Sequence, residues 1–399
     1  LHDTMTQTAE AAAIADAYTT LSDTGRRKFL ELLACEFWTD PAAVDAAIAE
    51  VRVAADRRAA ERYLRNALAP RAAVLLRLVT ALEGGVKFLV DLRADVSRLA
   101  NGDDALLDLD RELKAHIATL FDVGLLTLRR ITWDAPAALL EKLIAYEAVH
   151  AISSWADLKN RLDSDRRCYA FFHPAMPNEP LVFVEVALTS EIATSLAPLL
   201  DTRAPELDAD RAETAVFYSI SNCQPGLAGV NLGTALIKQV VEALRLDLPG
   251  VHRFVTLSPI PGFRAWLEHQ LGDTGGTLTE RERELLPAEP RRVLARLGDV
   301  EWEHDEAIRP ALLALCARYL TTTREGRALD PVANFHLANG AAVERINWMA
   351  DPSPVGRSRA FGLMANYLYD DDRIPERAEA YVVRGHVPTS AGVRDLIAG

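Results

Sequence analysis

The stretch that decides the fold runs from residue 218 to residue 241 and reads Tyr218-Ser-Ile-Ser-Asn-Cys-Gln-Pro-Gly-Leu-Ala-Gly-Val-Asn-Leu-Gly-Thr-Ala-Leu-Ile-Lys-Gln-Val-Val241. Its beginning has the side chains of a strand, and its end has the apolar spacing of an amphipathic helix. Between the two, Gly226 and Gly229 permit a tight turn. A strand that passes through a glycine turn directly into a helix predicts an α/β unit.

The same turn also suggests a chemical role. Free backbone N–H groups at a helix start, together with the helix dipole, favour an anion. Glycine lets a phosphate approach the backbone closely. The spacing matches neither the Walker pattern nor GxGxxG, so an ordinary structural turn explains it about as well as a phosphate site does. On the turn alone, both interpretations stay open.

Further apolar and β-branched runs surround this stretch. They predict strands over residues 168–172, 181–188, 215–221 and 253–258, and a helix over residues 230–246. The turn after His173 joins the first two runs as a hairpin. Strands that alternate with helices predict an α/β or α+β region.

Glycine and proline usage divides the chain. The first 165 residues contain five glycines and three prolines, whereas the remaining 234 residues contain 16 and 17. Both residue types interrupt helices, so a segment with few of them favours long helices. We therefore expect a helical bundle over residues 1–165, serving as scaffold or oligomerisation surface, and a mixed α/β domain over residues 166–399.

Cap and breaker residues locate the helices of the first part. Asp40 is an N-cap candidate for a helix that Pro41 begins, and the alanine-rich run over residues 42–68 is expected to continue without a break. Other helix boundaries are predicted at Gly84-Gly85, at Pro136 and at the pair Ser154 and Asp157.

Composition excludes several classes of protein. The chain has 399 residues, of which 49% are hydrophobic, and a net charge of −13. It is too apolar to be disordered and too acidic to bind nucleic acid through bulk charge. No apolar run reaches the roughly 18 residues of a membrane span, and the first ten residues lack the pattern of a signal peptide. The four cysteines are widely spaced, which argues against a disulfide framework or a structural zinc site. We expect a cytoplasmic protein.

Several long motifs, in the same order along the chain, resemble those of the malonyl-CoA decarboxylase family. They are Phe171-Phe-His-Pro-Ala-Met-Pro-Asn-Glu-Pro180, Val255-Thr-Leu-Ser-Pro-Ile-Pro-Gly-Phe-Arg-Ala-Trp-Leu267, Asp330-Pro-Val-Ala-Asn-Phe-His-Leu-Ala-Asn-Gly-Ala341, Val343-Glu-Arg-Ile-Asn-Trp-Met-Ala-Asp351 and Gly362-Leu-Met-Ala-Asn-Tyr-Leu-Tyr369. The glycine turn is similar to the pyrophosphate-binding turn of GNAT-type acetyltransferases. The resemblance implies a helical N-terminal domain followed by a GNAT-like, acyl-CoA-binding catalytic domain.

The resemblance also implies an activity and its residues. Malonyl-CoA would become acetyl-CoA and carbon dioxide through an enolate, without metal or organic cofactor, and coenzyme A would enter as part of the substrate. Ser258 and His336 take the positions of the family's catalytic serine and histidine. The coenzyme-binding turn corresponds to Ala228, Gly229, Val230, Asn231, Leu232, Gly233 and Thr234. Positions with less defined roles are Ser219, Gly226, His173 and Tyr367.

Two details qualify this assignment. Some relatives carry glutamate where this chain has Asn231, so an acid/base role tied to that carboxylate is in doubt here. His173 could line the substrate cleft or cap a hairpin.

A spacing argument links the two catalytic candidates. In GNAT folds a tyrosine four residues before a glycine protonates the departing thiolate, and His336 stands four residues before Gly340. This spacing predicts that His336 has taken over that position and shares one thioester with Ser258. Two alternatives remain, a GNAT-type acyltransferase and a non-catalytic malonyl-CoA sensor. The helical part is expected to form a homo-oligomer.

Overall fold

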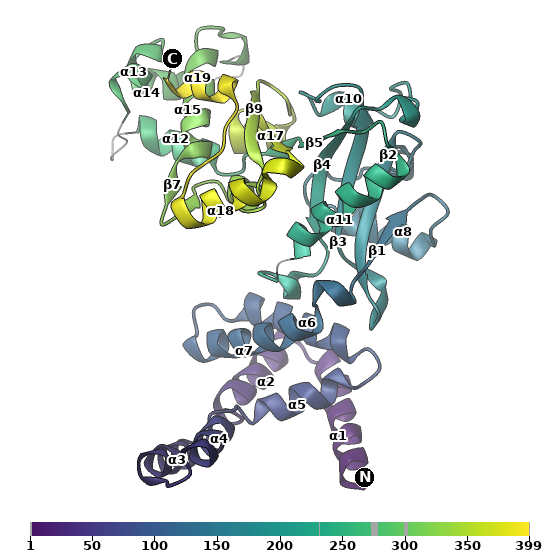
Figure 1. Ribbon diagram of the computed structural model, residues 1–399, viewed down its shortest axis with the longest axis vertical. Coiled ribbons are helices and arrows are strands. Elements are labelled where there is room, and N and C mark those ends of the chain that lie inside the picture. The colour runs from purple at the N-terminus through teal and green to yellow at the C-terminus, as the bar shows by residue number, and fades with distance from the viewer. Residues whose placement is uncertain (1, 231, 273–277, 299–301, 399) are drawn as a thin grey trace. The chain divides into compact units, whose positions relative to one another are not determined.

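The computed structural model describes residues 2–230, 232–272, 278–298 and 302–398 (Figure 1). Contacts divide the chain into two compact units. The first unit consists of residues 1–129, 170–182 and 222–235. The second consists of residues 130–169, 183–221 and 236–399. The domain boundary expected at residue 165 stays a prediction.

Helices form the N-terminal part of the first unit. They are α1 (His2–Thr19), α2 (Asp23–Cys35), α3 (Pro41–Val53), α4 (Arg57–Ala67), α5 (Ala72–Thr80), α6 (Gly85–Leu99) and α7 (Asp104–Leu120), shown in purple to blue in Figure 1. The predicted cap is confirmed, because Asp40 accepts hydrogen bonds from the first N–H groups of α3. The predicted break at Gly84-Gly85 is confirmed as well.

One helix prediction is wrong. The run over residues 42–68 is not continuous, because α3 ends at Val53 and α4 begins at Arg57. Asp56 caps α4 by accepting a hydrogen bond from the N–H group of Ala59. A short acidic side chain that satisfies the backbone locally competes with helix continuation. This cap interrupts a run whose alanine content favours a single helix.

The glycine turn belongs to the first unit and packs on α6. The turn contains a short 3₁₀ segment, Pro225–Leu227. The buried guanidinium of Arg93 in α6 donates to the carbonyl oxygens of Gly226 at 2.7 Å and Ala228 at 2.9 Å. It also donates to Asp110 of α7 at 3.0 Å. Arg93 therefore ties the turn to both helices.

Eight strands form one mixed sheet. They are β1 (Thr127–Ile131), β2 (Arg166–His173), β3 (Met176–Thr189), β4 (Thr214–Asn222), β5 (Arg253–Thr256), β6 (Ser258–Pro259), β9 (Ala342–Asn347) and β10 (Met364–Tyr369). Their order is β1-β2-β3-β4-β5-β10-β6, and β9 pairs with β10. A separate small pair consists of β7 (Thr323–Arg324) and β8 (Arg327–Ala328). The four predicted strand segments are found in β2, β3, β4 and β5–β6.

The remaining helices lie between and after these strands along the chain. They are α8 (Ala137–Tyr146), α9 (Trp155–Arg161), α10 (Ala197–Leu200), α11 (Leu232–Asp247), α12 (Phe263–Leu271), α13 (Glu280–Leu285), α14 (Pro290–Arg296), α15 (Arg309–Thr321), α16 (Pro331–Ala338), α17 (Pro354–Ala360), α18 (Ile374–Arg384) and α19 (Ala391–Ala398). Ser154 caps α9 by accepting from the N–H group of Asp157, as predicted. The helical N-terminal part followed by a mixed α/β part confirms the predicted fold class. No helix among the described residues is long and apolar enough to cross a membrane.

The central strands separate partway along their length. β4 and β5 are parallel and pair from Thr214 with Arg253 to Phe217 with Thr256. Beyond this point β4 continues to Asn222, whereas β6 pairs with the other end of β10, with Ser258 opposite Ala365. The strand predicted over residues 253–258 is thus interrupted at Leu257. A parallel pair that diverges beside a glycine turn and a helix is the arrangement implied by the GNAT resemblance.

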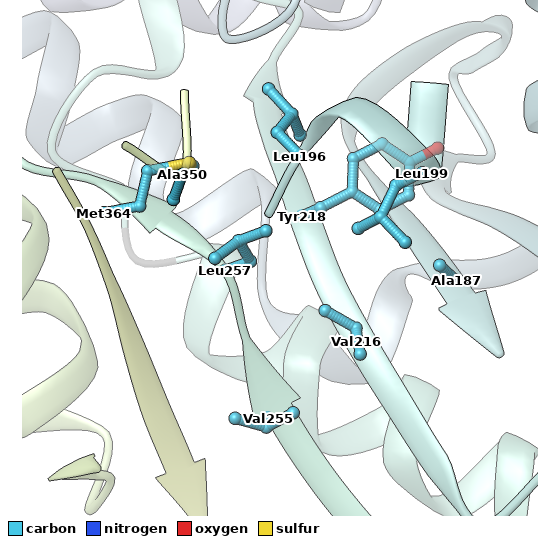
Figure 2. Packing of buried hydrophobic residues seen from close by; sticks show 9 residues of the cluster. All are labelled: Ala187, Leu196, Leu199, Val216, Tyr218, Val255, Leu257, Ala350 and Met364. Carbon is cyan, nitrogen blue, oxygen red and sulfur yellow. The ribbon is translucent and has the colours of Figure 1, made fainter. Parts of the chain in front are cut away.

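An apolar cluster covers one face of these strands in the second unit. It consists of Ala187, Leu196, Leu199, Val216, Tyr218, Val255, Leu257, Ala350 and Met364 (Figure 2). Each of these side chains is at most 5% exposed. Because side chains alternate along a strand, Thr256 and Ser258 point to the opposite face from Val255 and Leu257. The cluster therefore fixes which face of the sheet carries the polar residues.

Replacing Gly226 by alanine should destabilise the first unit. The added Cβ would fall well inside van der Waals contact with the carbonyl oxygen of Val90, which is backbone and cannot swing away. We expect G226A to lose about 1–3 kcal/mol of unfolding free energy, as overpacked sites do. Chemical denaturation measures this loss. G392A is the matched control, because a Cβ at Gly392 would meet only Ser390 Oγ at 3.9 Å. Equal stability of G226A and the parent chain would contradict this packing.

Candidate active site

Ser258 and His336 meet in the second unit. The Oγ atom of Ser258 lies 3.1 Å from Nε2 of His336, and the two residues are 6% and 2% exposed. Ser258 comes from β6, at the point where the chain has left β4. His336 lies on α16, which begins at Pro331 and is capped by Asp330. The two catalytic candidates, 78 residues apart in sequence, are therefore brought together by the fold.

Two tyrosines of β10 complete the surroundings of the histidine ring. Tyr369 Oη lies 2.8 Å from Nδ1 of His336. Tyr367 stacks on the imidazole, with ring centroids 4.6 Å apart and an interplanar angle of 25°. Both point toward α16 because residues two apart share one face of a strand. The resemblance had marked Tyr367. Sequence reasoning missed Tyr369, although its place in Asn-Tyr-Leu-Tyr carries the signal.

Thr256 supports the serine. Its Oγ1 accepts a hydrogen bond from Ser258 Oγ at 2.9 Å and another from the N–H group of Tyr367 at 3.1 Å. Thr256 and Ser258 are on the same face of their strand, and Thr256 is 1% exposed. A continuous hydrogen-bonded chain thus runs from Tyr369 through His336 and Ser258 to Thr256.

Burial keeps this centre neutral. Desolvation lowers the pKa of His336 from 6.5 to about 3, and burial is the only cause of the shift, so no charged neighbour offsets it. Burial also raises the pKa values of Tyr367 and Tyr369 above the ordinary tyrosine value. At neutral pH the histidine is an uncharged imidazole, which donates through one nitrogen and accepts through the other.

Ser219 has a different partner. Its hydroxyl donates to both carboxylate oxygens of Glu147, each at 2.8 Å. The same carboxylate accepts from the N–H groups of Val149 and His150 and from Ser221 Oγ. Ser219 is therefore part of a buried polar network that anchors the segment after α8 to β4. Nothing in the sequence around Glu147 indicated this network.

His173 is used within the hairpin of the first unit. Its Nδ1 accepts from the N–H group of Ala175 at 3.1 Å, and its Nε2 lies 3.1 Å from the carbonyl oxygen of Leu120. Both ring nitrogens are occupied by backbone groups, one in the hairpin and one at the end of α7. Of its two predicted roles, this geometry favours the hairpin cap.

The predicted coenzyme turn is shaped by Gly229, whose φ is +75°. Several of its N–H groups are consumed internally, since those of Leu227, Ala228 and Val230 bond to carbonyl oxygens of the turn. The N–H group of Leu232, where α11 begins, likewise bonds to the carbonyl oxygen of Val230, and Gly233 and Thr234 follow in the first turn of that helix. The remaining predicted member, Asn231, lies outside the described residues.

The ammonium group of Lys114 lies beside the turn. The Nζ atom of Lys114 on α7 lies so close to Gly229 that a Cβ there would come within 2.7 Å of it. Sequence reasoning missed this lysine, because the helix that carries it lies more than 100 residues before the turn. Among the residues that the structure describes, no three His, Cys, Asp or Glu side chains are grouped as metal ligands.

A helical N-terminal part, a mixed α/β part and a buried serine–histidine pair are the features that the sequence motifs predict for an enzyme of the decarboxylase class. Models of the malonyl-CoA decarboxylase N-terminal and C-terminal domains match residues 37–121 and 124–399. The chain therefore belongs to the malonyl-CoA decarboxylase family, which consists of carboxy-lyases.

Individual relatives agree with this assignment. The mitochondrial malonyl-CoA decarboxylase of Anser anser anser is 40% identical over 361 residues, which cover 85% of this chain and 71% of that protein. The crystal structure of malonyl-CoA decarboxylase from Rhodopseudomonas palustris is 41% identical with a TM-score of 0.90, covering 98% of this chain and 95% of that one. The crystal structure of malonyl-CoA decarboxylase from Agrobacterium vitis is 42% identical with a TM-score of 0.91, and it covers the same shares of the two chains.

The buried neutral histidine predicts an acid-sensitive stability. The pKa of His336 is about 3 in the folded chain and about 6.5 when unfolded, so between these values only the unfolded chain binds the proton. The contribution of the uncharged His336 to the free energy of unfolding is complete above pH 6.5. It is lost as the pH falls toward 3. We expect this stability loss on acidification to be shallower in H336Q, by up to about 1.4 kcal/mol per pH unit.

Urea denaturation at several pH values between 7 and 4 measures these slopes. H304Q is the control, because the side chain of His304 is 78% exposed and its removal should leave the slope of the parent chain. Parallel slopes for H336Q and the parent chain would show that His336 is not held neutral by burial.

Proposed function

We propose that this chain converts malonyl-CoA to acetyl-CoA and carbon dioxide through an enolate, using no metal and no organic cofactor. The observation that carries the proposal is the 3.1 Å contact between Ser258 and a fully buried, neutral His336 in a chain of this family. The two groups are close enough to act on one thioester, as the spacing of His336 and Gly340 predicts.

The chemistry requires a donor for an oxygen and a proton for a carbon. When the bond between C2 and the carboxylate breaks, its electron pair stays on the acetyl fragment and spreads onto the thioester oxygen. Prepared hydrogen-bond donors stabilise that oxyanion, and C2 then takes a proton that originates from water. Ser258 is suited to hydrogen-bond the oxygen, and His336 to deliver the proton.

A neutral imidazole can also hydrogen-bond the thioester oxygen, because it keeps one N–H group to donate. Lowering a histidine pKa so that the uncharged ring acts as the electrophile is an established way to stabilise an enolate-like intermediate. A buried centre also favours departure of carbon dioxide, because a cation paired with the substrate carboxylate would stabilise the ground state and oppose its loss. The site around His336 therefore fits decarboxylation better than it fits retention of a carboxylate.

Removing either group should lower the rate of decarboxylation. We expect S258A and H336Q to reduce kcat by about 10²- to 10⁴-fold while keeping the circular dichroism of the parent chain, since these are typical contributions of acid–base and oxyanion groups. Carbon dioxide release from malonyl-CoA, measured with a chelator present, checks this. The exposed variants S358A and H304Q serve as controls. Full activity of H336Q, or no turnover by the parent chain, would reject the proposal.

An acyltransferase is the second candidate, favoured by the GNAT-like divergence of β4 and β5. It would transfer an acyl group from the thioester to an amine and release little carbon dioxide. A non-catalytic sensor would bind malonyl-CoA without turnover. Product analysis in the same assay separates the three, because only the decarboxylase forms acetyl-CoA and carbon dioxide in equal amounts.

The helical part is proposed to form a homo-oligomer. Its helices carry large apolar side chains that are exposed to solvent in the single chain, among them Leu32, Val53 and Val74, and the turn after α2 carries the exposed Phe37. Exposed apolar side chains of this size favour association with a second copy, which would remove them from water. Light scattering after size-exclusion chromatography should show a mass above the 43.8 kDa of one chain. A monomer at micromolar concentration would refute this.

A further inference from the structure

Both ring nitrogens of His336 are occupied by hydroxyl groups. Nε2 faces Ser258 Oγ at 3.1 Å, and Nδ1 faces Tyr369 Oη at 2.8 Å. A neutral imidazole carries only one N–H proton, so one nitrogen donates and the other accepts. The partner of Nδ1 therefore decides whether Nε2, the nitrogen that faces the serine, acts as a donor or as an acceptor.

The hydroxyl proton of Tyr369 has a hydrogen-bond acceptor in only one of the two possible arrangements. Tyr369 is 5% exposed, and Nδ1 is its single hydrogen-bond partner among the residues that the structure describes. If Nδ1–H donated to Oη, the hydroxyl proton of Tyr369 would be buried without an acceptor, which is costly. If Oη–H donates to Nδ1, the hydroxyl is satisfied. The second arrangement leaves the imidazole proton on Nε2.

The rest of the hydrogen-bonded chain runs in the same direction. With its proton on Nε2, His336 donates to Ser258 Oγ. Ser258 then donates to Thr256 Oγ1 at 2.9 Å, and that oxygen accepts a further bond from the N–H group of Tyr367. Every donor from Tyr369 to Ser258 has an acceptor in this arrangement. Cooperative hydrogen bonds that share one direction strengthen one another.

We infer that Tyr369 is a positioning residue that holds His336 in the tautomer protonated at Nε2. This inference rests on the proposed function and adds a direction to it: His336 faces Ser258 as a proton donor. In serine hydrolases a carboxylate accepts the Nδ1 proton, so Nε2 is left as the base that activates the serine. A tyrosine in that place reverses the direction of hydrogen bonding through the imidazole, so that Nε2 carries the proton. This direction disfavours a covalent acyl-serine step and favours protonation of an enolate.

The direct test is nitrogen NMR of the whole chain labelled with ¹⁵N-histidine, with the signal of His336 assigned by its absence in H336Q. We expect the parent chain to show a protonated Nε2 and an unprotonated Nδ1. In Y369F this signal should move toward a mixture of the two tautomers. Y367F is the matched variant, because it removes a neighbouring hydroxyl from the same strand without touching Nδ1, and it should keep the tautomer of the parent chain.

Kinetics supply the second measurement. Y369F should lower kcat about 10- to 100-fold and change KM less than about twofold, because the hydroxyl acts through the histidine and not on the bound substrate. A parent chain protonated at Nδ1 would overturn the inference, as would a Y369F variant with unchanged tautomer and kcat. The NMR result stands apart from turnover, so failure of the proposed decarboxylation would be recognised separately. If Y369F did not fold, the spectrum of the parent chain would still decide.

Discussion

The divergence of β4 and β5 is the constraint on which the contact between Ser258 and His336 depends. Parallel pairing stops at Phe217 and Thr256, and the chain after Leu257 follows β10. The apolar cluster on the other face holds Val255 and Leu257 in place (Figure 2). Thr256 and Ser258 therefore point to the opposite face, where Ser258 meets His336 of α16. Had the pairing continued, backbone hydrogen bonds to β4 would have fixed the course of the chain at Ser258. The irregularity is thus what delivers the serine to the histidine.

Burial then decides what the pair can do. A histidine enclosed by Tyr367 and Tyr369 has no charged group to stabilise a positive ring, and its pKa falls to about 3. Such a ring is a poor proton acceptor at neutral pH. It remains a good hydrogen-bond donor, and donation is what a developing oxyanion requires. In the proposed mechanism, the two residue types that make a nucleophile in a hydrolase act in a lyase because the third partner is a neutral hydroxyl.

Sequence reasoning succeeded where the cause is local. The cap at Asp40 and the strand periodicity of β3 and β4 depend on residues within a few positions of each other. The catalytic roles that the long motifs give to Ser258 and His336 stay a prediction, although the fold brings the two residues together. Sequence reasoning failed where the cause is distant. Tyr369 and Glu147 meet their partners across 33 and 72 residues, and only the topology reveals this. β1 was missed because its sequence, Thr-Leu-Arg-Arg-Ile, alternates weakly and is half polar.

Arg93 has a consequence for how the protein could evolve and unfold. Its guanidinium holds the carbonyl oxygens of Gly226 and Ala228, so the glycine turn shares a compact unit with α6 and α7 although its flanking strand starts in the other unit. The turn therefore takes its resistance to local opening from the helices, and its amide protons should exchange with solvent as those of α6 do. A lineage that discarded the helices would lose the support of its own glycine turn. The N-terminal helices and the glycine turn therefore form one structural unit.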